Sequence, residues 1–147
     1  MRRALVAALL LFAPAPAYAD AIIVMIAATP TGDGVLTVPV GGDAAFAVAA
    51  INVGSTTNID GVSVRVFPGI GRPLPVTTAI CETDPANGQC LLHPRFSPFV
   101  AGEIRTYSVF VHATDAVTLN PGATRIAVEF STSAPYASTS VAVRTTP

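Results

Sequence analysis

Residues 47–68 have the sequence AVAAINVGSTTNIDGVSVRVFP, and this stretch decides the fold class. Its first part belongs to a longer run, Ala44–Val53, that is apolar on both faces of an extended chain and therefore predicts a central strand. Its last part alternates valine with polar residues from Val62 to Val66, which is the pattern of a strand with one face in water. The polar residues between the two parts, Gly54–Gly61, predict a connecting loop.

Similar short runs recur along the chain between clusters of glycine, proline and asparagine, whereas helical periodicity of useful length is absent. This organisation predicts an all-β fold: an immunoglobulin-like antiparallel β-sandwich with eight or nine strands. Further strands are expected at 21–28, 35–40, 76–80, 104–111 and 126–130, and around Val141 and Val143.

Three of these strands allow more detailed expectations. Ala21–Ala28 is apolar throughout, which predicts either a strand buried on both faces or a strand at a sheet edge. Pro39 predicts an edge position for its strand, because proline donates no hydrogen bond to a ladder. In residues 104–111 two faces compete for the core, one containing Tyr107 and the other Phe110.

The first 19 residues, MRRALVAALLLFAPAPAYA, have the three parts of a secretory signal peptide: two arginines, an apolar run and a final Ala-Tyr-Ala. The apolar run is about half of the roughly 20 residues that a membrane-spanning helix needs. We therefore expect residues 1–19 to be removed and residues 20–147 to form one periplasmic or extracellular domain, with no membrane insertion after cleavage. The alternative is an uncleaved anchor that continues into Ala21–Ala28, which would place Asp20 inside the membrane at substantial cost.

Cys81 and Cys90 are the two cysteines of the chain. In an oxidising compartment they predict one structural disulfide. The Asp-Pro and Asn-Gly pairs between them favour turns, so the two sulfur atoms can approach each other across a hairpin-like loop. A redox-active pair is the alternative, but such pairs usually have the spacing Cys-x-x-Cys.

The charge of the chain argues against nucleic acid as a partner. Charged residues make up 12% of the sequence, and all eight basic residues are arginines, two of which belong to the leader. The remaining six arginines are outnumbered by nine acidic residues, so the processed chain has a net negative charge. A basic patch for phosphates is not expected on such a chain.

The sequence offers little for catalysis. His93 and His112 are the only histidines, and no Gly-x-Ser-x-Gly nucleophile motif accompanies them. We expect no catalytic residues and no enzyme activity, and a small hydrolase or metal-binding protein that uses either histidine ranks as the last alternative.

The sequence also gives little evidence for a metal site. Zinc needs three or four histidine, cysteine or carboxylate ligands, and the two thiols are better used in a disulfide. Calcium is the best candidate among the ions, because four aspartates lie in turns that could gather carboxylates at one end of the sandwich. Aspartate in such turns, however, usually caps its own backbone. We expect no metal and no cofactor. The four aspartates are Asp33, Asp43, Asp60 and Asp84.

The segment 34–131 resembles the conserved-repeat and cell-adhesion-related (CARDB-like) domains of exported bacterial proteins. The usual pattern of that family is a strand that ends in Asn-x-Gly, a polar loop, and a valine-alternating strand that ends near proline. A cysteine pair and a glycine before a tyrosine-containing strand often follow. The resemblance implies an immunoglobulin-like sandwich and supplies no catalytic residues. The matching positions are Asn52, Val53 and Gly54, then Val62–Pro68, and then Cys81, Cys90, Gly102 and Tyr107.

Loops at the ends of a sandwich commonly display binding residues, although they can also merely connect strands. The first functional hypothesis is an exported, non-enzymatic interaction or structural module that binds another envelope or extracellular protein through two such loops. The alternative is a fimbria-like subunit that polymerises by adding its N-terminal strand to a neighbour's sheet. The candidate loop residues are Ser55, Thr56, Thr57, Asn58 and Asp60 in the first loop, and Ile70 and Arg72 in the second.

Overall fold

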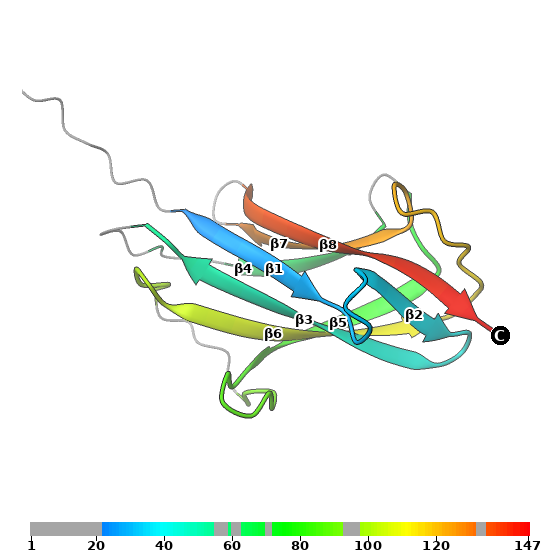
Figure 1. The fold of residues 1–147 in the computed structure, drawn as a ribbon, viewed down its shortest axis with the longest axis horizontal. Helices are drawn as coiled ribbons and strands as arrows, with labels where there is room; N and C mark the ends of the chain where they lie inside the picture. Colours follow the sequence, from blue (N-terminus) through cyan, green and yellow to red (C-terminus); the bar gives the residue numbers. More distant parts are fainter. Residues whose placement is uncertain (1–21, 55–58, 60–62, 70–71, 93–97, 132–134) are drawn as a thin grey trace, which may run out of the picture.

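The computed structural model describes residues 22–54, 59, 63–69, 72–92, 98–131 and 135–147, and these residues form two packed β-sheets (Figure 1). The first sheet has the order β1 (Ile23–Ala28), β3 (Asp43–Asn52), β6 (Ile104–Ala113), β5 (Val76–Thr83). The second has the order β2 (Val35–Pro39), β8 (Pro135–Thr146), β7 (Arg125–Ser131), β4 (Ser63–Pro68). The described part of the chain thus contains eight strands and no helix, which confirms the predicted all-β sandwich.

The strand order is that of an immunoglobulin domain. With β1 and β3 to β8 lettered A to G in chain order, the first sheet is ABED and the second contains CFG. The strand without a letter, β2, lies beside β8 and runs parallel to it, whereas every other ladder is antiparallel. The parallel pair arises because the chain crosses between the sheets after β1 and continues in the same direction (Figure 1).

The core lies between the sheets and is formed by alternate residues of each strand. Phe46, Val48 and Ala50 of β3 point inward, as do Ile126, Val128 and Phe130 of β7. In β6 the face with Tyr107 is buried, and its ring packs edge-on against Phe130 at a centroid distance of 5.4 Å. Phe110 lies on the opposite face and is exposed. The structure therefore shows which face of β6 enters the core, a choice that the sequence left open. The inward side chains also include Leu36, Val38, Val109, Val111, Val141 and Val143.

β1 and β2 each form an edge of one sheet. Pro39 lies in β2, an edge strand, as predicted. β1 is also an edge strand, but it is not buried on both faces: Ile23 is buried, whereas Val24 and Ile26 are exposed. The central position predicted for β3 is confirmed, since it lies between β1 and β6. Its second apolar face, however, lies on the outside of the sheet, with Ala47 and Ala49 exposed.

A buried polar cluster closes one end of the sandwich. The side-chain amide of Asn52 donates to the carbonyl of Phe99 (2.9 Å), and its oxygen accepts from the backbone N–H of Gly54 (3.0 Å). Arg105 donates through Nε to Glu103 (2.9 Å), and its guanidinium lies 4.9 Å from the centre of the Phe99 ring. Burial disfavours the charged form of Arg105, but the Glu103 carboxylate outweighs it and raises the pKa of the guanidinium. The cluster therefore fixes the segment that leads into β6.

Candidate interaction surface

The outer face of the β1-β3-β6-β5 sheet is apolar and uncharged over most of its length. The ladders place its outward side chains in rows, such as Val24 beside Ile51 and Ile104, and Ile26 beside Ala49 and Thr106. We call this surface the uncharged face. Its residues are Val24, Ile26, Ala28, Ala45, Ala47, Ala49, Ile51, Ala79, Ile104, Thr106, Ser108 and Phe110.

Large apolar side chains on this face are open to solvent. The exposed fraction is 66% for Ile26, 51% for Ile104, 45% for Phe110 and 43% for Val24. Four strands about 4.8 Å apart, with about eight residues of each at roughly 3.3 Å, span about 500 Å². Apolar patches of this size on a monomer often mark an interaction site.

The outer face of the second sheet is different, because charged residues are spread across it. Arg144 of β8 donates to the Thr37 hydroxyl of β2 (2.9 Å). Arg125 of β7 donates to the hydroxyl and the carbonyl of Ser140 (2.9 Å each). Arg65 of β4 lies opposite Glu129 of β7 in the ladder. The two outer faces of one sandwich thus differ in kind: one is suited to water, and the other to an apolar partner.

The uncharged face contains a groove of about 270 Å³. Its floor consists of small side chains, among them Ala47, Ala49 and Ser108. One wall is formed by β1 through Ile26, and the other by the loop that follows β5, through Pro85. Because the floor is low and both walls are higher, the groove has room for an extended segment or for side chains of a partner.

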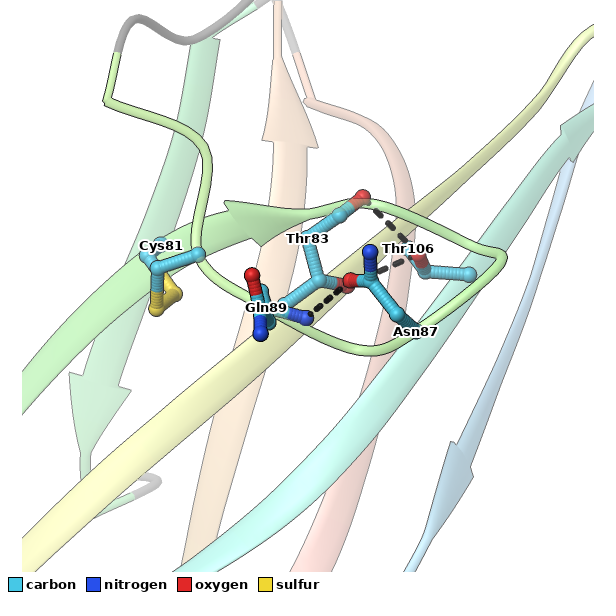
Figure 2. The surroundings of a disulfide bond; sticks show 6 residues. Cys81, Thr83, Asn87, Gln89 and Thr106 are labelled. Atoms are coloured by element: carbon cyan, nitrogen blue, oxygen red, sulfur yellow. Dashed lines mark hydrogen bonds between the residues drawn. A yellow bond between two sulfur atoms is a disulfide. The ribbon is translucent and has the colours of Figure 1, made fainter.

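The disulfide holds the wall of this groove in place (Figure 2). Cys81 and Cys90 are bonded, with their Cα atoms 5.6 Å apart, and the loop between them is a hairpin, as the sequence predicted. The hairpin is closed by a bridge between Thr83 and Cys90 and by a hydrogen bond from the Asp84 N–H to the Gln89 carbonyl (2.9 Å).

Contacts inside the hairpin and to the sheet complete this arrangement. The Asn87 side chain accepts from the Gln89 N–H (2.9 Å), which orders the turn. The Thr83 hydroxyl donates to that of Thr106 on β6 (2.8 Å), and Thr106 donates to the Thr83 carbonyl (3.2 Å). The hairpin is therefore fastened to the sheet by hydroxyl contacts and closed by the disulfide (Figure 2).

An Asp–His pair lies at one end of the uncharged face. His112 Nδ1 is 3.0 Å from the Asp43 carboxylate, and both side chains are exposed. Thr77 is opposite His112 in the β5–β6 ladder. A carboxylate can orient an imidazole as a base, but catalysis also needs a nucleophile within hydrogen-bond reach. Among the described residues, no Ser, Thr or Cys side chain is seen to hydrogen bond to His112. His93 lies outside the described residues.

Among the described residues, the aspartates considered for calcium form no common site. Asp43 and Asp84 are near opposite ends of the first sheet, about seven strand residues or roughly 23 Å apart along it. Asp33 and Asp84 instead cap their own turns, accepting from the N–H groups of Val35 (2.9 Å) and Ala86 (2.8 Å). Asp60 lies outside the described residues, and within them no group of three potential metal ligands occurs.

The candidate loop residues were expected at the sandwich ends. Ser55–Asn58, Asp60 and Ile70 lie outside the described residues, whereas Arg72 is described and exposed. Arg72 lines a pocket of about 600 Å³ together with Leu119 and Asn120.

Sequence reasoning missed the uncharged face. The signal was present in Ala44–Val53, which is apolar on both faces, but from this pattern we predicted only a central strand. Because the second face consists mainly of alanines, it is apolar without needing cover. Only the strand order shows that Val24 and Ile104 extend it into a broad surface.

The chain matches no protein-family model, no curated protein and no solved structure. No helix long and apolar enough to cross a membrane occurs within the described residues. The predicted signal peptide, residues 1–19, lies outside them.

Proposed function

We propose that the protein is an exported, non-enzymatic interaction or structural module of the cell envelope or exterior, and that it binds a partner protein through the uncharged face. The observation that carries the proposal is the contrast between the two outer faces. Water-exposed sheets usually carry polar side chains outside, as the second sheet does with Arg65, Arg125 and Arg144. The first sheet instead exposes Ile26, Ile104 and neighbouring alanines.

The expected location follows from two features. The leader of residues 1–19 has the layout of a cleaved signal peptide. The disulfide is compatible with an oxidising compartment, where such bonds persist.

The experiment is a crosslinking capture with matched charge insertions. Residues 20–147, with the disulfide formed, are crosslinked in an envelope extract, and the captured proteins are identified by mass spectrometry. Ala49→Arg places a charge at the centre of the uncharged face, and Ala127→Arg places the same charge on the outer face of β7 as the control.

The two variants give opposite expectations. The wild type and Ala127→Arg should capture the same discrete partner, and Ala49→Arg should lose it. Replacing the 55–60 loop with a scrambled sequence should leave capture by the face intact. If Ala49→Arg keeps the partner and the scrambled loop loses it, binding belongs to the end loop and the face has no such role.

A second candidate is the fimbria-like subunit, and the position of β1 favours it. β1 is apolar, lies at a sheet edge and directly follows the predicted cleavage site, so it is placed to add to a neighbour's sheet. Polymers of the mature chain that resist mild denaturant would support this function. A mature chain that never forms more than a small closed assembly would exclude it.

A further inference from the structure

The four edges of the two sheets are not equally protected against pairing with another chain. Native edges are usually blocked by proline, by charge or by a covering segment. β2 contains Pro39, and β4 contains Arg65 and ends at Pro68. β5 is covered at its end by the hairpin, where the Leu91 N–H donates to the Glu82 carbonyl (2.8 Å).

β1 has none of these devices. Its sequence, IVMIAA, contains no charge, no proline and no glycine. In the part of the chain that the structure describes, it pairs with β3 alone. β8 is its neighbour in the other sheet, but no ladder joins the two strands. The edge of β1 away from β3 therefore carries backbone groups available to a further strand.

The hydrogen-bond phase of the β1–β3 ladder identifies those groups. The Val53 N–H donates to the Ile22 carbonyl (2.8 Å). The backbone N–H and C=O groups of Ile22, and of every second residue after it, therefore point toward β3. The backbone groups of the residues between them face outward. The outward-facing set is Ile23, Met25 and Ala27.

This set is symmetric about Met25, which decides what can pair with it. In an antiparallel pair of two β1 strands centred on Met25, that residue faces its own copy and Ile23 faces Ala27 of the other chain. All outward groups are then used, in about six backbone hydrogen bonds. On the outer side Val24 meets Ile26 of the second copy, a β-branched pair of the kind that stabilises sheets.

We propose that the protein forms a closed two-fold dimer through its β1 edges, so that the two four-stranded sheets become one continuous sheet. In this pair the same edge is used on both copies, so the contact is isologous and the assembly closes at two chains instead of growing. The uncharged faces of the two copies then lie side by side as one surface. The dimer uses the edge and not the face, so it does not depend on the docking proposed above.

The first test is the mass of the mature chain in solution, measured by sedimentation with the disulfide intact. The wild type should have the mass of two chains. Met25→Pro should weaken the dimer at least about tenfold, because it removes an N–H that faces the partner and none that faces β3. Proline is tolerated at such an edge position, and thermal unfolding of the variant checks that it folds.

The second test is independent of proline and reports the register. In the proposed pair, residues 24 and 26 of opposite chains are a non-hydrogen-bonded pair with Cα atoms about 4.5 Å apart, which suits a disulfide. The double variant Val24→Cys with Ile26→Cys should therefore crosslink two chains on oxidation. Val24→Cys alone should not, because its copies are diagonal neighbours too far apart.

Several results would overturn the proposal. These are a monomeric wild type at about 100 µM, open-ended polymers, a Met25→Pro variant that folds and remains a dimer, or equal crosslinking of the single and double cysteine variants. A dimer that Ala49→Arg abolishes would also overturn it, since that residue lies on the face. If Met25→Pro loses the dimer but still captures the partner protein, the result supports pairing through the β1 edge and leaves the proposed binding through the uncharged face intact.

Discussion

Asn52 gives the sharpest test of how the fold is held together. It is fully buried, and its side chain hydrogen bonds to the Phe99 carbonyl and to the Gly54 N–H. Asn52→Ala removes both hydrogen bonds at once and leaves the two backbone groups in place. The Phe99 carbonyl keeps the Ile59 N–H (3.0 Å), so the buried Gly54 N–H is the group that loses its partner. An unsatisfied buried donor costs about 1–3 kcal/mol, and the variant should lose about that much unfolding free energy.

The assay is urea unfolding of the oxidised mature chain at neutral pH, followed by tyrosine fluorescence or by circular dichroism. The midpoint should fall while the m-value stays constant, since the same surface is exposed on unfolding. The matched control is Thr77→Ala, an exposed position on β5, which should change stability by less than about 0.5 kcal/mol.

A second variant separates the two contacts of Asn52. Asn52→Asp keeps the acceptor for Gly54 but replaces the donor with a carboxylate oxygen that faces the Phe99 carbonyl. Burial should raise the pKa of this carboxyl in the folded state, so the stability of the variant should be greatest at low pH and fall as pH rises through the folded pKa. The reasoning is refuted if Asn52→Ala loses less than about 1 kcal/mol, or if the stability of Asn52→Asp does not fall with rising pH.

Three further predictions concern the disulfide, the buried ion pair and an acidic turn. Replacing Cys81 and Cys90 by alanine should cost about 2.7 kcal/mol of unfolding free energy, from the ten-residue loop on the chain-entropy model, and equal stability in urea would contradict this. Glu103→Ala should cost about 3 kcal/mol, because it leaves the buried Arg105 guanidinium without that carboxylate; an unchanged urea midpoint would show that other groups compensate. The Thr31 hydroxyl and the Val35 N–H lower the pKa of Asp33 below 3.8, so its stabilisation is present above that pH and is lost as pH falls through the lowered pKa. Asp33→Asn should accordingly show a weaker loss of stability in acid than the wild type, measured by thermal unfolding from pH 5 to pH 2.

Local patterns were sufficient for the fold class. The alternation in Ile126–Phe130 and the valines of Val62–Val66 have a period of two, which is a property of a single strand and needs no knowledge of its neighbours. The disulfide was also predictable, since turn-forming residues separate the two cysteines and close the loop locally. Pro39 marked an edge for the same reason, because its missing N–H is a local property.

Sheet order, by contrast, depends on contacts between segments far apart in the sequence, and only the tertiary structure decided it. The pairing of β2 with β8 joins residues more than a hundred positions apart, and nothing in either segment specifies a parallel ladder. The face of β6 that enters the core was settled by its partner Phe130 on the other sheet. The uncharged face arises in the same way: the sequence supplies apolar residues on β1, β3 and β6 separately, and because the ladders set these strands side by side, they become one surface.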